Sequence, residues 1–324
     1  MRVLILAPRL DVPFKNLGPV PSTRGPIPSI RVHWVNFVKC VAAEHQRRND
    51  EVHVLELPLW QFTPELVHEH KPDIVYVPHK ERHAFPIDDS IDTRYYMQSV
   101  FPWRFYVDKK GFAGGASTYP CYSFVMKGDE SQSDFDKLRE YSLAGGTKFD
   151  QPPSRNLNLP ENYVLFPCQI PHDETIKHHS DVTVERALEE TCQLTNMMNV
   201  PLIVKGHPVN PSSMVNLKNI CAKYANAIWV DDINIHDLIH KARVVVVVNS
   251  GTGMESLLHM RPVITFGRCE YDVVTMNAEI GCMGNFRDMI KYPIYNLANV
   301  KRFFNSWCKW TYDTQTPSDF NKLA

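Results

Sequence analysis

At 324 residues, the chain is long enough for two domains of ordinary size, each with its own hydrophobic core. Apolar residues make up 44% of it and charged residues 22%, which is typical of a soluble globular protein and excludes wholesale disorder. The formal net charge of -1 gives no reason to expect nucleic acid or an anionic membrane as a partner. No apolar run approaches the roughly 20 residues that span a bilayer, and Met1 leads into a strand-like segment without a signal-peptide layout. We therefore expect a cytoplasmic protein without a transmembrane segment, whose membrane contact, if any, is peripheral and at the inner face.

The eight cysteines are scattered through the chain and form no C-x-x-C pair. They stand at positions 40, 121, 168, 192, 221, 269, 282 and 308. Scattered cysteines in an intracellular protein are most often buried free thiols. This spacing favours neither disulfides nor a zinc site, and we expect no metal ligands among these cysteines.

The N-terminal part of the chain alternates predicted strands with predicted helices. In order, these elements are residues 2–7, 29–46, 51–57, 64–70 and 73–77. Thr63 offers an N-cap to the second helix, and Pro64 suits its first position. Such alternation predicts a parallel, doubly wound α/β sheet. The loop 8–28 is unusually long and dense in Pro and Gly, and long loops within compact α/β domains tend to be functional.

A less regular region follows. Short strands are expected at 105–108 and 122–126, on either side of the loop KKGFAGGASTYP, and a helix at 133–143. Residues 145–160 contain three prolines, two asparagines and little apolar content. This change in composition predicts an interdomain linker.

After the predicted linker, the pattern indicates a second Rossmann-like domain. Its strands and helices are expected, in order, at 163–166, 182–198, 202–204, 212–224, 227–230 and 235–241. The aromatic, amphipathic tail 300–310 predicts a terminal helix that packs across the domains. We therefore divide the chain into an N-terminal domain (1–155), a C-terminal domain (156–295) and a crossover segment (296–324).

The stretch from Val244 to Asp272 is the most informative in the chain. Five valines and the small-residue turn at 249–253 predict a buried parallel strand that ends at a turn. A helix is expected at 254–260, and a second buried strand at 263–266. Unpaired N–H groups and the helix dipole at such a turn favour an anion such as a phosphate.

Three loops follow three strands of the second domain, and ligands of open α/β sheets bind beyond the carboxyl ends of the strands. They are residues 167–174, the loop Lys205-Gly206-His207-Pro208, and the turn that contains Ser250. Lys205 and His207 can both donate to a phosphate, with Gly206 allowing a close backbone approach. A solvated lysine and a hydrogen-bonded structural histidine would give the same four residues.

The polar residues around the turn also have ordinary structural uses. Ser250 and Thr252 can be helix N-caps, and a carboxylate in the first helical turn, such as Glu255, is favoured by the helix dipole. Glu255 is equally well placed to accept hydrogen bonds from a ribose. Asp173 can cap a nearby helix, or act as a nucleophile or ion stabiliser beside an anomeric carbon. The pair Asp231-Asp232 is expected in a loop after a strand, as solvated charge.

Three motifs carry a resemblance to a known family. FPCQIPHDETI, VKGHP and VVNSGTGMESLLHMRPVITFGRCEYD occur in the order and with roughly the spacing seen in bacterial capsule-polysaccharide biosynthesis proteins. That family includes the β-Kdo transferases, and it resembles more distantly the sialyltransferases that share a His-Pro motif. The resemblance covers residues 162–275. It implies the GT-B fold: two Rossmann-like domains with a cleft between them, the donor nucleotide on the C-terminal domain and the acceptor on the N-terminal one.

The resemblance also implies roles for individual residues. Lys205 and His207 would hold the phosphate of a CMP-sugar, with Ser250, Gly251 and Thr252 completing that site. Glu255 would contact the ribose or the cytosine side. Gln169 and Asp173 would face the sugar, with Asp173 as the nucleophile if the enzyme retains configuration. Helix N–H groups and cationic side chains would stabilise the departing phosphate, so no metal and no cofactor beyond the donor substrate are expected.

The first domain departs from the family pattern. Related enzymes carry an acidic Glu-Asp-Gly-Phe type motif there, and the nearest stretch in this chain is Asp108-Lys109-Lys110-Gly111-Phe112. Lysine replaces the acid next to the glycine, which leaves Asp108 as the candidate acid/base.

The sequence thus predicts a glycosyltransferase that moves an acidic sugar, Kdo from CMP-Kdo, onto a saccharide or glycolipid acceptor in surface polysaccharide synthesis. One alternative is the same fold with another donor, as in a UDP-sugar transferase or a nucleotide-sugar epimerase. Another is a nucleotide- or saccharide-binding protein that has lost turnover.

Overall fold

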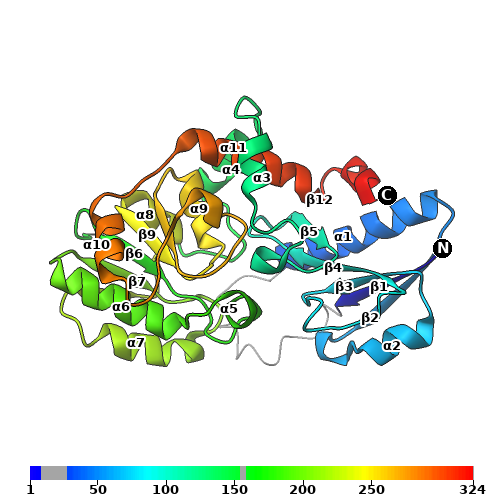
Figure 1. Ribbon diagram of the computed structural model, residues 1–324, viewed down its shortest axis with the longest axis horizontal. Coiled ribbons are helices and arrows are strands. Elements are labelled where there is room, and N and C mark those ends of the chain that lie inside the picture. The colour runs from blue at the N-terminus through cyan, green and yellow to red at the C-terminus, as the bar shows by residue number, and fades with distance from the viewer. Residues whose placement is uncertain (9–27, 154–157, 324) are drawn as a thin grey trace. The chain divides into compact units, whose positions relative to one another are not determined.

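The computed structural model describes residues 1–8, 28–153 and 158–323. The chain folds into two compact units (Figure 1). Unit 1 comprises residues 1–119 and 308–324, and unit 2 comprises residues 120–307. Apart from its two ends, the long loop predicted at 8–28 lies outside the described residues, as do residues 154–157 of the predicted linker.

Unit 1 is built on a six-stranded mixed sheet with the order β12-β5-β4-β3-β1-β2. Its strands are β1 (Arg2–Pro8), β2 (Glu51–Leu57), β3 (Ile74–Pro78), β4 (Asp92–Gln98), β5 (Arg104–Asp108) and β12 (Tyr312–Asp313). The pairs among β2, β1, β3 and β4 are parallel, whereas β5 pairs antiparallel with β4 and with β12. The helical segments are α1 (Pro28–Arg47), η1 (Leu59–Gln61), α2 (Pro64–His70), η2 (Ala113–Gly115) and η5 (Pro317–Leu323).

Alternate residues of β1 supply the two cores of unit 1, as the period of a strand requires. Val3 and Ile5 belong to the core cluster that includes α1 and η5. Leu4 and Leu6 belong to the opposite cluster, which includes Val67 of α2. Helices therefore cover both faces of the sheet, and the predicted Thr63 cap of α2 is confirmed, because its side chain accepts a hydrogen bond from the Leu66 N–H.

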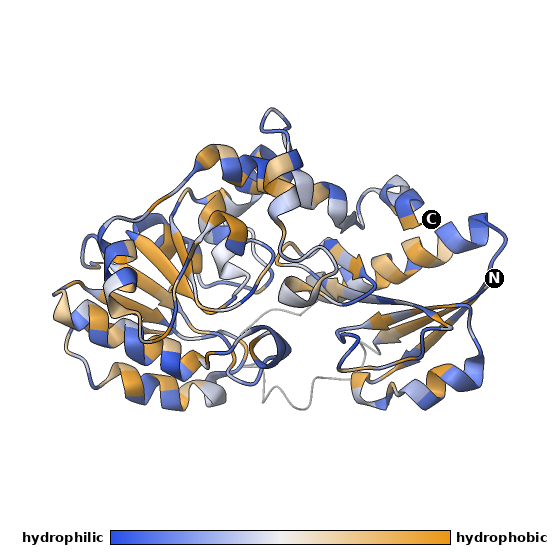
Figure 2. Cartoon of the chain, viewed as in Figure 1, coloured by the Kyte–Doolittle hydropathy of each residue, from blue (hydrophilic) through white to orange (hydrophobic). Residues whose placement is uncertain are grey.

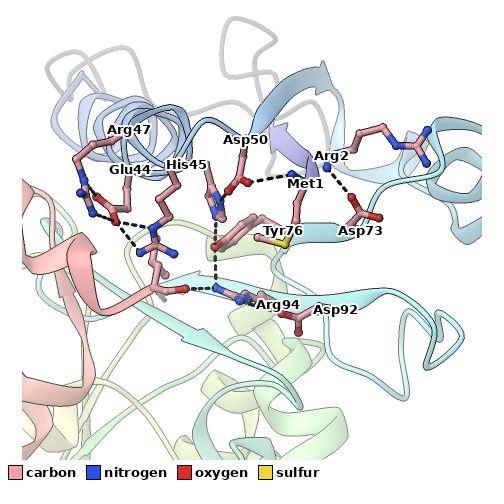
Figure 3. Close-up of polar contacts among 12 residues, drawn as sticks. Met1, Arg2, Glu44, His45, Arg47, Asp50, Asp73, Tyr76, Asp92 and Arg94 are labelled. Carbon is pink, nitrogen blue, oxygen red and sulfur yellow. Dashed lines mark hydrogen bonds and ion pairs between the residues drawn. The ribbon is translucent and has the colours of Figure 1, made fainter.

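A buried polar network joins α1, β3 and β4 of unit 1 (Figure 3). His45 places Nδ1 2.8 Å from Asp50 Oδ2 and Nε2 2.9 Å from the Tyr76 hydroxyl. Arg94 donates to the same hydroxyl at 3.1 Å and to the Leu323 carbonyl at 2.6 Å. Each of these polar groups therefore has a partner inside the unit, which fits a stabilising role.

Unit 2 is built on a six-stranded, wholly parallel sheet with the order β11-β10-β9-β6-β7-β8. Its strands are β6 (Val164–Pro167), β7 (Leu202–Lys205), β8 (Ala227–Val230), β9 (Val244–Val247), β10 (Val263–Thr265) and β11 (Met276–Asn277). Helices α3 (Tyr122–Lys127), α4 (Asp134–Leu143), α5 (Glu174–His179), α6 (Val184–Met197), α7 (Val215–Cys221), α8 (Ile235–Lys241), α9 (Thr252–Leu258), α10 (Met283–Lys291) and most of α11 (Leu297–Trp310) belong to it, together with η3 (Pro211–Met214) and η4 (Asp272–Val274).

The central strands of unit 2 are apolar on both faces, as expected for a parallel sheet covered by helices (Figure 2). All four residues of β6, β7 and β9 are buried. One face packs against α6, α7 and α10, which contribute Leu188, Leu217 and Phe286 to its core. The predicted strand–turn–helix–strand unit is present, as β9, the turn, α9 and β10.

Three differences from the expected elements concern the irregular region. Residues 122–126 form part of helix α3 and not a strand, and Phe124, buried against Phe303 of α11, is the residue that anchors it. A short apolar run does not distinguish the two structures by itself. Strand β4 is present although the sequence did not predict it.

The third difference is the domain boundary, which was expected near residue 155. Residues 120–153 belong to unit 2, because α4 packs on α9 and Asn305 of α11 binds the start of α4. The Asn305 amide oxygen accepts from the Phe135 N–H at 2.9 Å. The Asn305 amide nitrogen donates to the Asp129 and Gln132 carbonyls. Composition marked an irregular segment correctly, but it did not show to which unit the segment packs.

Candidate functional site

The three predicted loops meet at the carboxyl edge of the unit 2 sheet. Strand β6 lies between β7 and β9, with Val164 in register with both Leu202 and Val244. The chain leaves these three strands at Cys168, Gly206 and Val248, so the loops that follow are neighbours. The predicted convergence is therefore confirmed.

Gln169 fastens two of these loops together. Its amide nitrogen donates to Asn249 Oδ1 at 2.9 Å, and its amide oxygen accepts from the Asn249 N–H at 3.0 Å. Asn249 in turn donates to the Thr175 carbonyl at 2.9 Å. Both amides are buried. Gln169 was predicted to face a sugar; the structure shows it holding the loops after β6 and β9 in place, and Asn249 is a partner that the motif did not reveal.

Lys205 is buried, so the interpretation of it as a solvated surface charge is wrong. Its ammonium donates to the Asp231 carbonyl at 2.7 Å and to the Gly206 carbonyl at 3.2 Å. Gly206 permits this packing, because a Cβ there would lie 2.3 Å from Asp231 Oδ1. Lys205 thus braces the loop after β7 against the end of β8. The Asp231 carboxylate itself is exposed, as expected, and pairs loosely with Lys218.

His207 lies half-buried at the same edge. Its Nδ1 accepts from the Val209 N–H at 3.2 Å, which places the ring proton of the neutral form on Nε2. The ring also packs edge-on against Phe149, with 5.6 Å between the ring centroids. The loop therefore orients His207 as an Nε2–H donor, which suits a phosphate oxygen.

The turn after β9 has an unexpected hydrogen-bond pattern. Gly251 is the N-cap of α9 and no side chain caps the helix; the Thr252 N–H donates instead to the Ser250 hydroxyl at 3.2 Å. The Gly253 N–H is also used within the turn, by the Ser250 carbonyl. Among the described residues the Gly251 N–H has no hydrogen-bond partner, and it is exposed. The turn thus offers an anion fewer N–H groups than the sequence suggested.

Glu255 is buried in the first turn of α9. Burial raises the pKa of its carboxyl to about 7, against which a hydrogen bond from the Thr147 hydroxyl acts. Its Oε1 has no hydrogen-bond partner among the described residues. At neutral pH this carboxyl is therefore about equally charged and neutral, and can accept or donate a further hydrogen bond.

Residues 147–149, which lie within the predicted linker, contact the loops of this site. Thr147 bonds Glu255 beyond β9, and Phe149 packs on His207 beyond β7. Between them, half-buried Lys148 lies within electrostatic reach of Asp173 beyond β6. The only sequence signal was the pair Gly145-Gly146 at the end of a predicted helix, which is typical of a helix C-cap.

A cavity of about 820 Å³ opens beside this segment. It is lined by Thr147 and Phe149 and by three histidines, His236, His240 and His259. His236 Nδ1 lies 3.0 Å from His259 Nε2, so the two rings share one hydrogen bond. Burial lowers the pKa of both, that of His259 to about 4 with the help of the neighbouring His236 and His240 charges. Because Thr147 also bonds Glu255, the cavity adjoins the edge of the sheet.

Asp173 is the N-cap of α5. Its Oδ1 accepts from the Thr175 N–H at 2.9 Å and from the Thr175 hydroxyl at 2.8 Å. The side chain is exposed at the carboxyl edge. The capping use is confirmed, and a chemical role for its second oxygen remains a prediction.

Asp108, in unit 1, organises its own loop. Its Oδ1 accepts from the N–H groups of Lys110, Gly111 and Ser117 at 2.7, 3.1 and 2.9 Å, and its Oδ2 accepts from the Ser117 hydroxyl. Buried Glu81 packs against the same loop, with Oε1 3.5 Å from the Phe112 nitrogen. The acid/base role suggested for Asp108 remains a prediction, and the structure shows a loop-shaping role.

Two other expectations concern cysteines and metals. All eight cysteines are free thiols, and six of them are buried, as their spacing suggested. Within residues 1–8, 28–153 and 158–323, no group of three or more His, Cys, Asp or Glu side chains is arranged to hold a metal ion.

Comparison with known proteins places the chain in a family. The family model described as "Capsule polysaccharide biosynthesis protein" matches residues 117–283, about half of the chain. The chain belongs to the capsule polysaccharide biosynthesis protein family. The matched region begins before α3 and ends at the start of α10, so it contains every segment of the candidate site in unit 2.

Two curated relatives are similar to this family member over part of their length. The capsule polysaccharide export protein KpsS of Escherichia coli is 25% identical over 125 residues, which cover 36% of this chain and 32% of KpsS. Protein FixF of Sinorhizobium fredii is 25% identical over 186 residues, covering 53% of this chain and 42% of FixF. The chain thus spans less than half the length of these relatives.

Solved structures of two enzymes share the fold of this family member. The β-Kdo 2,7 transferase of Thermosulfurimonas dismutans KpsC aligns with a TM-score of 0.55 at 14% identity, covering 82% of this chain and 86% of that one. The β-Kdo 2,4 transferase of the same KpsC aligns with a TM-score of 0.51 at 16% identity, covering 82% and 87%. The predicted fold class, two Rossmann-like α/β domains of the GT-B type, is confirmed. Over the part of this family member that the structure describes, no helix is both long and apolar enough to cross a membrane.

Proposed function

We propose that this member of the capsule polysaccharide biosynthesis protein family is a glycosyltransferase that transfers Kdo from CMP-Kdo to a saccharide acceptor. One observation carries the proposal: three loops with different polar groups converge at the carboxyl edge of the unit 2 sheet. The loop after β7 presents His207, the loop after β9 presents the Ser250 turn and Glu255, and the loop after β6 presents Asp173. Open α/β sheets bind nucleotides at this edge. Two proteins that share the fold are named β-Kdo transferases, which supports the choice of sugar.

The proposed donor site uses the edge for the phosphate and the cavity for the nucleoside. The Nε2–H of His207, the Gly251 N–H and the hydroxyls of Ser250 and Thr252 would bind the phosphate oxygens. Glu255, with a buried oxygen that lacks a partner among the described residues, would bind the ribose. The adjoining cavity of about 820 Å³ is within the size range of small-molecule sites. Lys205 contributes by holding the His207 loop in place.

The proposed chemistry is a double displacement at the anomeric carbon. The Asp173 carboxylate would attack that carbon as its bond to the phosphate breaks, and CMP would leave with the electron pair. An acceptor hydroxyl would then displace Asp173 and give its proton to a base, for which Asp108 is the predicted group. Hydrogen-bond donors at the sheet edge would stabilise the departing phosphate, and we propose that no metal is required.

Nucleotide titration tests the donor site. Isothermal titration of the full chain with CMP, UDP and GDP should show selective binding of CMP, and His207→Ala should weaken it about tenfold or more. The same titration after EDTA treatment should give an unchanged affinity. Selective binding of UDP would favour a UDP-sugar transferase or epimerase, and equal binding of CMP by His207→Ala would remove His207 from the site.

A product assay tests turnover. Wild-type protein with CMP-Kdo and an oligosaccharide acceptor should release CMP, and intact-protein mass spectrometry in the absence of acceptor should detect a glycosyl adduct. Asp173→Ala should give neither product. CMP binding without any transfer or hydrolysis would favour a binding protein without turnover. Full activity of Asp173→Ala would exclude Asp173 as the nucleophile.

A further inference from the structure

The segment from Gly145 to Phe149 is held rigidly at its start. Helix α4 ends in a Schellman motif, in which the Gly145 N–H bonds the Ser142 carbonyl and the Gly146 N–H bonds the Tyr141 carbonyl. Gly145 has a φ of +85°, a left-handed conformation that favours glycine. A Cβ on Gly146 would lie 2.4 Å from the Tyr141 ring. These contacts fix the direction in which the chain leaves α4.

The next three residues each meet a different loop of the candidate site. The Thr147 hydroxyl bonds Glu255, which follows β9. The Phe149 ring packs on His207, which follows β7. Lys148, between them, carries its ammonium 5.9 Å from the Phe149 ring centroid and feels the charge of Asp173, which follows β6. The segment therefore covers the edge where the three loops converge.

The two lysines of this region are used differently. The Lys205 ammonium is buried and donates to two backbone carbonyls, which leaves it little capacity to serve a ligand. Lys148 is only half-buried, and it lies near an aromatic ring and within electrostatic reach of an exposed carboxylate. Burial lowers the pKa of its amine to about 8, against the opposing effect of Asp173. The turn before α9 adds one unpaired N–H among the described residues, so a phosphate there would need a further cation.

We propose that Lys148 is a binding residue of the donor site and supplies the positive charge that holds the phosphate of a nucleotide-linked sugar. The inference rests on the proposed function, because it assigns a residue to that site. Thr147 and Phe149 position Lys148 by anchoring the segment on both sides. The motif K-G-H-P predicted this role for Lys205, whereas Lys148 lies 57 positions earlier in the chain.

Removal of the charge tests the assignment. Lys148→Met should weaken CMP binding by about 10- to 100-fold, the range expected for loss of one charge-assisted hydrogen bond. Binding of cytidine, which lacks the phosphate, should change less than twofold, and Lys148→Arg should retain most of the CMP affinity. Lys291→Met, the same change at an exposed lysine of α10, is the matched control and should bind CMP as the wild type does. Circular dichroism and thermal unfolding would establish that each variant is folded. Unchanged CMP affinity in Lys148→Met would overturn the inference.

The pH dependence of binding adds a second readout. The other titratable groups that face the segment are Asp173, His207, Glu255 and Tyr141, together with three histidines that line the same cavity, His236, His240 and His259. Because the Lys148 amine has a pKa of about 8, wild-type affinity for CMP should fall as the pH rises from 7 to 9. The arginine variant stays charged over this range and should remove the fall. A fall of equal size in Lys148→Arg would assign the titration to another group and contradict the inference.

Chemical labelling separates this inference from the proposed function. Lys148 of the full chain should react with acetic anhydride with a profile centred near pH 8, and both CMP and inorganic phosphate should protect it. If no nucleotide binds, the proposed function fails, but protection of Lys148 by inorganic phosphate would still support an anion site. Labelling that neither CMP, UDP, GDP nor phosphate reduces would show that Lys148 binds no anion.

Discussion

The polar network of unit 1 and the polar edge of the unit 2 sheet use similar residues in opposite ways. In unit 1, hydrogen bonds link His45 to Asp50 and to the Tyr76 hydroxyl, which also accepts from Arg94 (Figure 3). In unit 2, Glu255 keeps a buried oxygen that no described residue bonds. Burial also raises the pKa of Glu255 to about 7 and lowers that of the Lys148 amine to about 8, which favours the uncharged form in both cases. A completed network stabilises a fold, whereas buried groups that bear a desolvation cost mark a place that a ligand can complete.

Asp50 of unit 1 and the polar residues of unit 2 also lie at different ends of their strands. Asp50 immediately precedes β2, and it also binds the ammonium of Met1 at the start of β1. The unit 2 residues lie just after β6, β7 and β9. Since the carboxyl ends of parallel strands host ligands, position and chemistry agree. Residue type alone therefore does not separate structural from functional polar groups, whereas their hydrogen-bond partners and their place on the sheet do.

The largest loss of stability is expected when a side chain fills the space beside the Ser250 turn of unit 2. In Gly253→Ala, the new Cβ would lie 2.4 Å from the Tyr271 hydroxyl oxygen. Tyr271 is buried and its hydroxyl bonds the Ser250 carbonyl, so it cannot move without disturbing the turn. We expect a loss of about 3 kcal/mol in the free energy of unfolding, measured in urea, together with weaker nucleotide binding.

A matched glycine provides the control for that change. A Cβ at Gly284, in the first turn of α10, would meet no atom within 4 Å. Gly284→Ala should therefore stabilise the protein by about 0.5 kcal/mol through helix propensity and the unfolded chain. A loss below about 1 kcal/mol for Gly253→Ala would show that the turn is more plastic than the packing indicates.

Removing the charge of Glu255 should raise the free energy of unfolding, in contrast to the loss expected for Gly253→Ala. Its carboxyl titrates near pH 7 in the folded state, against an ordinary value of 4.5. Between these values the folded protein binds more protons than the unfolded chain, so this group lowers stability as the pH rises from about 4.5 to 7. Glu255→Gln should therefore be more stable than the wild type at pH 8, by at most about 3 kcal/mol, and nearly equal to it at pH 4.

His259 also affects how the stability of the protein depends on pH. The pKa of His259, lowered to about 4, makes stability rise between about pH 4 and 6.5. This rise opposes the Glu255 effect in the wild type, so urea unfolding from pH 4 to 8 should show a steeper rise in Glu255→Gln. Glu161→Gln, at an exposed site, serves as the control. A less stable Glu255→Gln at pH 8 would mean that the carboxylate stabilises the fold, and that unit 2 resembles unit 1 in this respect.

The sequence predicted the sheet of unit 2 and its three loops, because long apolar runs and turn residues report local structure directly. It did not predict the segment 145–149, since Gly and Pro content does not show what a segment packs against. The burial of Lys205 escapes prediction for the same reason: it depends on the carbonyl of Asp231, which the fold alone brings near. Asn249, by contrast, stands inside a motif, but its partner Gln169 lies 80 positions away and gives no local signal. Helix α3 differs from the predicted strand because its apolar run is too short to distinguish the two.

A moderate loss of stability is expected when hydrogen bonds of the unit 1 network are removed. Arg94→Met removes hydrogen bonds to Tyr76, to Asp92 and to the Leu323 carbonyl at the end of η5. We expect a loss of about 2 kcal/mol in the free energy of unfolding, with earlier hydrogen exchange in η5. Arg287→Met, which breaks an exposed pair with Asp288, should change stability by less than about 0.5 kcal/mol. Equal effects of the two changes would remove the distinction between the network and ordinary surface charge.

The smallest effect on stability is expected at Asp173, where two substitutions distinguish its capping role from its proposed role as nucleophile. Asp173→Ala removes the cap of α5 and should cost about 1 kcal/mol, whereas Asp173→Asn keeps an oxygen that can accept from the Thr175 N–H and should cost almost nothing. Thr183→Ala, which removes the cap of α6, should show the same loss as Asp173→Ala without any effect on transfer. Because an amide cannot act as the nucleophile, Asp173→Asn should be as stable as the wild type and inactive in the CMP-release assay. Normal transfer by Asp173→Asn would show that Asp173 only caps α5 and has no chemical role at the edge of the unit 2 sheet.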